Sequence, residues 1–349
     1  MTAQPREIPK WVTTWGCAHR NPRGLVLPGT SAFFVSFPNN VAGSALRARF
    51  GNLYGRTSAR AAGCGVTIGR TDMEPLPGAG QREFAVPPGR DVYSAPLECC
   101  VPAGCTITVR VTLPPGEVPA SGNDFPDGAL MALLQGVEVL TADDVKVVAC
   151  FGDSITHRGT WTGPLRDRLY RERPGGVSLL EVGVGGNRLM GDSDHMARGM
   201  SGLRRFPHDI LGIAGLSHVI LALGSNDIGH PGVKEWASLS EIPTPASYAR
   251  AVSSIRGALH ARGVKAIGAT ITPRSWSGER PDERESLRRE INDWILHGGA
   301  FDETLDFSAL LAQQGIAGLP PEFDSGDGLH ISGAAGRRLA EQIPLEIFT

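Results

Sequence analysis

Residues 147–156 read Val-Val-Ala-Cys-Phe-Gly-Asp-Ser-Ile-Thr, an apolar run that ends abruptly in a polar turn. Such a run is typical of a parallel strand that is covered on both faces. A serine in the turn from strand to helix has its Oγ exposed at the sheet edge, where a nucleophile can act. Its backbone N–H points outward near the helix start and can bind an anion. A capping role for Ser154 or Asp153 explains these residues equally well.

Strands and helices alternate from this run to the C-terminus. We predict strands at residues 146–151, 177–184, 218–223, 264–271 and 303–307. We predict helices between them at residues 163–173, 199–211, 245–262, 283–297 and 333–346. Five strands with intervening helices indicate an α/β fold with a doubly wound parallel sheet, in which ligands gather beyond the carboxyl ends of the strands.

The first 140 residues have a different pattern. Residues 45–50 and 105–113 alternate apolar with polar or charged residues, as half-buried strands do. Residues 129–134 have helical propensity, but we favour a last strand that includes residues 137–140. Short strands separated by Gly and Pro turns indicate a β-sandwich. We therefore predict an all-β domain over residues 1–140 and an α/β domain over residues 145–349.

Composition excludes several classes of protein. The 34 Lys and Arg against 36 Asp and Glu give a net charge of −2, with no basic excess for nucleic acid. The sequence contains no run of about 18 apolar residues, so it predicts no membrane-spanning helix. The N-terminus has no apolar signal core, so we expect a cytoplasmic protein, or a secreted one if a leader has been removed. Six cysteines without a CxxC pair argue against a disulfide framework or a zinc site.

Two further loops follow predicted strands. Gly183-Val-Gly-Gly-Asn187 offers the N–H of Gly186 as a donor to an oxyanion, although a tight turn or a dinucleotide loop explains it as well. Leu223-Gly-Ser-Asn-Asp227 offers the amide of Asn226, for which the alternative is an Asx turn.

The stretch Asp324-Ser-Gly-Asp-Gly-Leu-His330 supplies a base. His330 is a candidate general base, with Asp327 holding its tautomer and Asp324 as the rival partner. A lone loop histidine is usually structural. The combination of a nucleophile, two donors and a base–acid pair on separate loops of one sheet indicates ester cleavage. We interpret Asp153 and Asp227 as structural braces of these loops.

Ser154, Gly186, Asn226 and His330, in this order and within these motifs, resemble the four hallmark residues of the SGNH/GDSL hydrolases. Arg205-Phe-Pro-His-Asp209 looks like the subgroup with an N-terminal β domain. The resemblance is strong over residues 145–349 and looser over 11–140. It implies a flavodoxin-like, doubly wound, five-stranded parallel sheet preceded by a jelly-roll-like β-sandwich. It also implies a serine esterase without metal or cofactor, with Ser154, His330 and Asp327 as the triad and Ser154, Gly186 and Asn226 as the oxyanion donors.

This chain departs from the family in two places, and its substrate is less defined. The short segment 157–160 suggests an open wall beside the nucleophile, and Glu181 stands where relatives often carry Asn. Arg188 and Trp161 would suit a polar alcohol, with the indole stacking on a sugar ring, although Trp161 packing the first helix is an equal alternative.

We expect hydrolysis of short-acyl, chiefly acetyl, esters of carbohydrates or other small molecules, with an arylesterase or a general short-chain lipolytic esterase as alternatives. A carbohydrate-binding protein with a decayed site is the alternative of another class. An oligomer is compatible with the sequence, and the role of the β domain is left open.

Overall fold

The structure, a computed structural model, describes residues 8–21, 32–79, 83–117, 119–124, 130–193 and 198–349. The chain forms two compact units. The first comprises Met1–Val147, Leu169–Leu180 and Ile213–Leu216, and the second comprises Val148–Arg168, Glu181–Gly212 and Ser217–Thr349. The domain limits at residues 140 and 145 stay a prediction.

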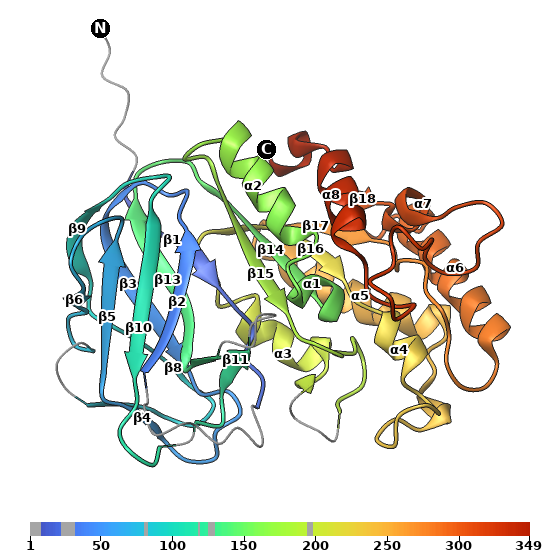
Figure 1. The fold of residues 1–349 in the computed structure, drawn as a ribbon, viewed down its shortest axis with the longest axis horizontal. Coiled ribbons are helices and arrows are strands. Elements are labelled where there is room, and N and C mark those ends of the chain that lie inside the picture. The colour runs from blue at the N-terminus through green and yellow to red at the C-terminus, as the bar shows by residue number, and fades with distance from the viewer. Residues whose placement is uncertain (1–7, 22–31, 80–82, 118, 125–129, 194–197) are drawn as a thin grey trace, which may run out of the picture. The chain divides into compact units, whose positions relative to one another are not determined.

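The first unit is built from antiparallel sheets (Figure 1). One sheet has the order β1-β13-β3-β8, formed by Lys10–Gly16, Leu134–Thr141, Gly43–Gly51 and Asp91–Tyr93, with β9 (Leu97–Val101) also paired to β3. The other has the order β2-β10-β5-β6, formed by Ala32–Pro38, Thr106–Thr112, Gly63–Ile68 and Glu74–Pro75. Two small sheets pair β4 (Ala59–Ala61) with β7 (Phe84–Val86) and β11 (Gly122–Asp124) with β12 (Leu130–Ala132).

Alternation of apolar residues explains why these strands form a two-layered core. In β10, Ile107, Val109 and Val111 are buried, while the residues between them are more exposed. The rings of Trp15 and Phe37, one from each large sheet, stack with centroids 5.5 Å apart. The all-β prediction is confirmed, and the strand assigned to residues 137–140 is part of β13. Residue 129 lies outside the described residues.

Residues 146–305 contain the predicted parallel sheet. Its strands are β14 (Lys146–Gly152), β15 (Val177–Gly183), β16 (Leu216–Ala222), β17 (Lys265–Ala269) and β18 (Glu303–Leu305). The spatial order is β15-β14-β16-β17-β18. Numbered along the chain this is 2-1-3-4-5, the flavodoxin-like doubly wound order. The predicted fold class is confirmed.

Helices flank this sheet (Figure 1). The longer ones are α2 (Thr162–Glu172), α3 (Gly202–Asp209), α5 (Pro245–His260), α6 (Pro281–His297) and α8 (Gly333–Gln342). The helix predicted over residues 333–346 is too long: α8 stops at Gln342, because Pro344 disfavours helical conformation in the residue before it. A short 3₁₀ turn, Leu345–Phe348, follows. Three short helices, α1 (Ser154–His157), α4 (Ser225–Gly229) and α7 (Phe307–Leu311), begin directly after strands.

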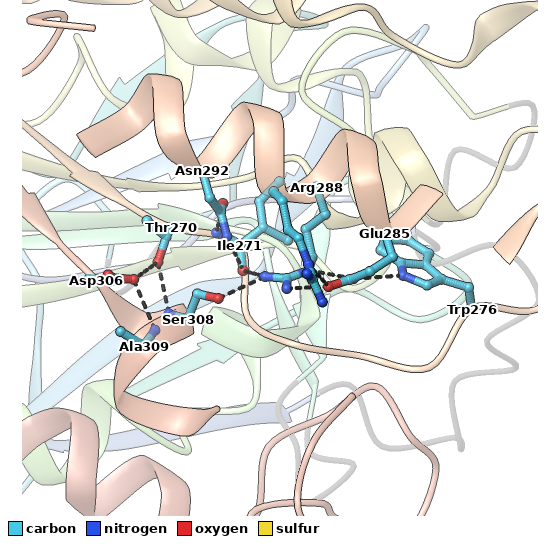
Figure 2. A network of polar contacts seen from close by, with 10 residues as sticks. Thr270, Ile271, Trp276, Glu285, Arg288, Asn292, Asp306, Ser308 and Ala309 are labelled. Atoms are coloured by element: carbon cyan, nitrogen blue, oxygen red, sulfur yellow. Dashed lines mark hydrogen bonds and ion pairs between the residues drawn. The ribbon is translucent and has the colours of Figure 1, made fainter. Parts of the chain in front are cut away.

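A buried polar network fixes the segment that follows β17 (Figure 2). Asn292 of α6 accepts from the N–H of Ile271 and donates to its carbonyl, over 2.8 and 2.9 Å. Arg288 donates to the same carbonyl over 2.8 Å. Further along this segment, the N–H of Ser275 donates to the carbonyl of Gly328 over 2.6 Å. The α6 helix therefore supports the loop that precedes His330.

No helix within the described residues is both long enough and apolar enough to cross a membrane.

Candidate active site

Ser154 lies at a sharp turn between β14 and α1. Asp153 caps the helix, with its Oδ1 accepting a hydrogen bond from the backbone N–H of Ile155 over 2.9 Å. Only glycine fits at position 152, because a Cβ there would collide with the side chain of Thr156. The turn thus fixes the serine as the first residue of α1, at the carboxyl end of a central strand.

His330 and Asp327 form a hydrogen-bonded chain with Ser154. His330 Nε2 lies 2.8 Å from Ser154 Oγ, and His330 Nδ1 lies 2.5 Å from Asp327 Oδ2. An ionised carboxylate is only an acceptor, so Nδ1 carries the proton and Nε2 is free to accept one from the serine. Asp327 Oδ1 also accepts from the N–H groups of Leu329 and His330, over 3.0 and 2.8 Å. One carboxylate therefore holds both the ring and the backbone of the histidine.

The pKa values of this pair favour a neutral base. Burial opposes ionisation of Asp327, but hydrogen bonds from the backbone and ring of His330 outweigh it and hold the pKa of Asp327 well below its usual range. Burial is the main cause that lowers the pKa of His330; the hydrogen bond to Asp327 opposes this, and the charges of Arg158 and Arg274 reinforce it. The imidazole is thus neutral at pH values where a free histidine begins to be protonated.

Asp324, the rival partner, has a different task. Its Oδ1 accepts hydrogen bonds from three backbone N–H groups, those of Gly326, Asp327 and Gly328, over 2.8 to 3.1 Å. These bonds shape the loop that carries Asp327. The structure therefore places Asp327, and not Asp324, against the imidazole of His330.

Gly186 and Asn226 lie on the two neighbouring loops. Gly186 has a φ of 71°, a conformation that favours glycine. Asn226 is buried in α4, and its Nδ2 donates to the carbonyl of Asn187 over 3.0 Å and to Asp153 Oδ2 over 3.3 Å. Asn226 thereby joins the Gly186 turn to the turn of the nucleophile. The long contact with Asp153 is the weaker of the two, so it is the one that a better acceptor would replace.

Two buried carboxylates stabilise these loops through hydrogen bonds. Asp227 accepts from the N–H groups of Leu189 and Met190, over 2.7 and 2.9 Å, which fixes the chain just after the Gly186 turn. Asp153 caps α1 and accepts from Asn226. Burial raises the pKa of both carboxyl groups to about 6.

Arg205 of α3 is a supporting residue whose contacts the sequence did not reveal. Its guanidinium is fully buried and donates to the carbonyl of Gly152 over 2.8 Å and to Asn187 Oδ1 over 2.9 Å. It also pairs with Asp209 over 3.1 Å. Arg205 therefore ties the residue before the nucleophile turn to the residue after Gly186. The Arg205-Phe-Pro-His-Asp209 motif marks this residue in the sequence, but the motif does not show which groups the Arg205 side chain contacts.

The two residues predicted to bind substrate are both buried. Trp161 has no exposed surface and packs edge-on against Phe307, with ring centroids 5.2 Å apart. This corrects the expectation of sugar stacking, because a buried ring has no free face. Arg188 is 3% exposed, and both its terminal nitrogens lie 3.0 Å from Glu241 Oε2, so its charge is already paired. Glu181, at the position where relatives often carry Asn, accepts a hydrogen bond from Thr162 over 2.5 Å.

A family model describes what this site is similar to. The model of the GDSL-like Lipase/Acylhydrolase family matches residues 150–338, more than half of the chain. No curated protein gives a significant match. Among solved structures, a carbohydrate acetylesterase from Sinorhizobium meliloti is 19% identical, with a TM-score of 0.43, over 58% of this chain and 98% of that one. An aryl esterase from M. smegmatis is also 19% identical, with a TM-score of 0.42, over 57% and 98%.

Proposed function

Because the chain belongs to the GDSL-like lipase/acylhydrolase family and is an ester hydrolase, we propose that it cleaves short-acyl esters, chiefly acetyl esters of carbohydrates, through Ser154, His330 and Asp327. The observation that carries this proposal is the continuous chain of hydrogen bonds from the serine hydroxyl through the imidazole to the carboxylate. One hydrogen bond is enough to hold a structural histidine, whereas a catalytic histidine needs one bond to the serine hydroxyl and a second bond to the carboxylate.

Acylation follows from this geometry. His330 Nε2 takes the hydroxyl proton as Ser154 Oγ forms a bond to the carbonyl carbon of the ester. Asp327 remains ionised and stabilises the imidazolium. The tetrahedral intermediate then expels the alcohol, which receives the same proton from Nε2. A water molecule attacks the acyl-serine with His330 again as the base, and this releases the acid and restores the serine.

The negative charge that develops on the carbonyl oxygen needs donors. The backbone N–H groups of Ser154 and Gly186 and the amide of Asn226 are the proposed donors. Each is worth about 3 kcal/mol in the transition state. Asn226 is suited to this role because its long bond to Asp153 can be exchanged for a bond to the oxyanion.

The surroundings of Ser154 favour a short acyl group and a polar alcohol. The sequence contains no long apolar segment that would cover a fatty acyl chain. The four-residue α1 helix ends at His157, and the exposed Arg158 follows immediately. An apolar chain at this position would desolvate the charged side chain without forming a hydrogen bond to it, which costs free energy. A polar alcohol such as a partly acetylated sugar avoids this cost because its hydroxyl groups can form hydrogen bonds.

A panel of esters tests the proposal. We expect wild-type protein to release acetate from acetylated sugars with a higher kcat/KM than it shows for para-nitrophenyl palmitate. Ser154→Ala removes all of these activities while the circular dichroism spectrum stays that of the wild type. Turnover retained by Ser154→Ala would contradict the triad, and a preference for the long acyl chain would contradict the substrate class. A preference for phenyl acetate over every sugar ester would favour the arylesterase alternative.

A further inference from the structure

Two arginines beside the catalytic residues have no carboxylate partner among the residues that the structure describes. They are Arg158 and Arg198. Most neighbouring arginines are paired: Arg188 with Glu241, Arg204 with Asp192 and Arg205 with Asp209. An exposed guanidinium that is not neutralised by its own chain is available for a negatively charged ligand.

Arg158 lies one helical turn after the nucleophile. It is the C-cap of α1, and its N–H donates to the carbonyl of Ser154 over 3.1 Å. Its side chain is exposed. Burial is the main cause that lowers the pKa of His330, and the positive charge of Arg158 adds to it; the hydrogen bond that His330 donates to Asp327 opposes both. The backbone bond to Ser154 places Arg158 beside the nucleophile, and its charge acts on the reacting centre.

Arg198 lies against the Gly186 turn. A Cβ at Gly186 would meet the Nη1, Cδ and Cζ atoms of Arg198, the Cδ at 3.0 Å. Its Cζ lies 5.9 Å from the ring centroid of Trp236, which supports the guanidinium from one side. The half-buried Arg198 thus lies against an aromatic ring and a glycine backbone, with no carboxylate paired to it among the described residues.

Among the residues that the structure describes, the carboxylates around this pair are engaged with other groups. Asp327 holds His330, Glu241 holds Arg188, and Asp192 binds Arg204 and the N–H of Ser201. Asp153 and Asp227 are buried beneath the loops and accept from backbone N–H groups. A third cation, Arg274, is buried against Ser225 and adds to the positive potential.

We propose that Arg158 and Arg198 form a cationic rim that selects esters bearing a carboxylate near the scissile bond. On the alcohol side this describes an acetylated acidic sugar, and on the acyl side a half-ester of a dicarboxylic acid. The inference rests on the proposed function, because it names the substrate class of the same site. A carboxylate between two guanidiniums gains charge-assisted hydrogen bonds and is steered toward the site.

Matched pairs of esters separate charge from every other property. On the alcohol side, para-acetoxybenzoate is compared with its uncharged primary amide. On the acyl side, the para-nitrophenyl monoester of adipic acid is compared with para-nitrophenyl hexanoate. The readout is the ratio of kcat/KM for the charged ester to that for the neutral one. Any change in His330 acts on both members of a pair and cancels in this ratio.

We expect the wild-type ratio to be about tenfold on at least one side, as ion pairing at a partly exposed site allows. Arg158→Gln and Arg198→Gln each lower it by about threefold, and the double variant brings it near one. Arg158→Lys and Arg198→Lys keep more of the preference than the Gln variants. About 0.5 M NaCl weakens the wild-type preference, because salt screens exposed charges. Arg250→Gln, on the exposed face of α5, is the matched control and leaves the ratio unchanged.

Each outcome bears on one of the two proposals. A wild-type ratio near one on both sides, with hydrolysis of the neutral esters intact, overturns the cationic rim and leaves the esterase. A preference that persists in the double variant also overturns it. Failure of every ester to be hydrolysed overturns the proposed function and the rim together. The side that shows the preference identifies whether the carboxylate belongs to the alcohol or to the acyl group.

Discussion

Two polar networks of the second unit contain the same kinds of side chain and differ in how completely they are satisfied. In the α6 network (Figure 2), Arg288 is 6% exposed at its side chain and donates to Ile271, Ser308 and both oxygens of Glu285, over 2.7 to 2.9 Å. In the catalytic network, the side chains of His330 and Asp327 are 13% and 46% exposed, and each link is a single bond.

This difference indicates that the α6 network has a structural role and that the catalytic network has a chemical one. A fully satisfied network fixes one arrangement of the chain, here the segment that follows β17. The catalytic network contains bonds that can be exchanged during the reaction: Ser154 gives its proton to His330 Nε2, and Asn226 holds a long contact that an oxyanion can replace. Substitutions in the first network should therefore change stability, and substitutions in the second should change turnover.

Asp327→Asn should show the largest effect. The amide would donate to His330 Nδ1 and leave the proton on Nε2, which then cannot accept from Ser154. We expect kcat to fall by about 10⁴-fold, the cost of the wrong tautomer in a serine triad. The free energy of unfolding should change little, because the side chain is half exposed. Steady-state kinetics and urea denaturation measure the two quantities.

Asp324→Asn is the matched control for that variant. Its oxygen can still accept the three loop N–H groups, so kcat should stay within tenfold of the wild type. A larger loss in Asp324→Asn than in Asp327→Asn would reverse the assignment of the two carboxylates.

Asn226→Ala should give the next largest effect on turnover. Loss of one oxyanion donor lowers kcat by about 10²–10³-fold, since the donor acts mainly in the transition state. KM should change much less than kcat. If KM rises and kcat is unchanged, Asn226 binds the substrate in its ground state and is not an oxyanion donor.

Much of this site could be predicted from the sequence because its parts follow strands that are easy to recognise. The apolar runs of β14 and β16 indicated where their carboxyl ends lie, and Ser154 and Asn226 follow two and four residues after the last residues of these strands, Gly152 and Ala222. The short helices that carry these residues were missed, since α1 has four residues and α4 has five, too few for a helical period.

Side-chain direction is what the sequence did not reveal. Trp161 and Arg188 are near the motifs in the chain, but one points into the core and the other pairs with Glu241, 53 residues away. Arg198 follows no motif and reaches the Gly186 turn only through the fold. Proximity in sequence places a backbone at the site, whereas packing of distant segments decides which side chains face it.

Arg288→Met tests the other network. Removing one partner of a buried ion pair costs about 3 kcal/mol, less than a fully isolated charge would cost because Glu285 keeps Arg289 and Trp276. Burial opposes the ionisation of Glu285, but hydrogen bonds from Arg288, Arg289 and Trp276 lower its pKa to about 2. Urea denaturation should show the loss, while kcat per folded molecule falls less than in Asn226→Ala.

Arg289→Met provides the comparison within the same helix. Arg289 bonds the same Glu285 but is 74% exposed, so its loss should cost about 0.5 kcal/mol or less. Equal destabilisation by the two substitutions would mean that burial does not distinguish them and would weaken the contrast between the networks.

The smallest expected effect is a shift in pH dependence. The pKa of His330 lies below its ordinary value, so kcat/KM should stay on its plateau as the pH falls through about 6.5 and decline only at lower pH. Arg158→Gln removes a cation that disfavours the imidazolium, so the pKa of His330 should rise. The acidic limb should then move to higher pH by less than about one pH unit.

Asp153 and Asp227, whose pKa values burial raises to about 6, titrate in the same range; the charges of Arg274 and Arg205 act on Asp153, and the charge of Arg188 acts on Asp227. The charge of Arg158 acts on His330, so its substitution separates the histidine from the buried carboxylates. If the acidic limb does not move in Arg158→Gln, the decline in activity at low pH is due to Asp153 or Asp227. If the limb moves to lower pH, the sign of the charge effect is contradicted.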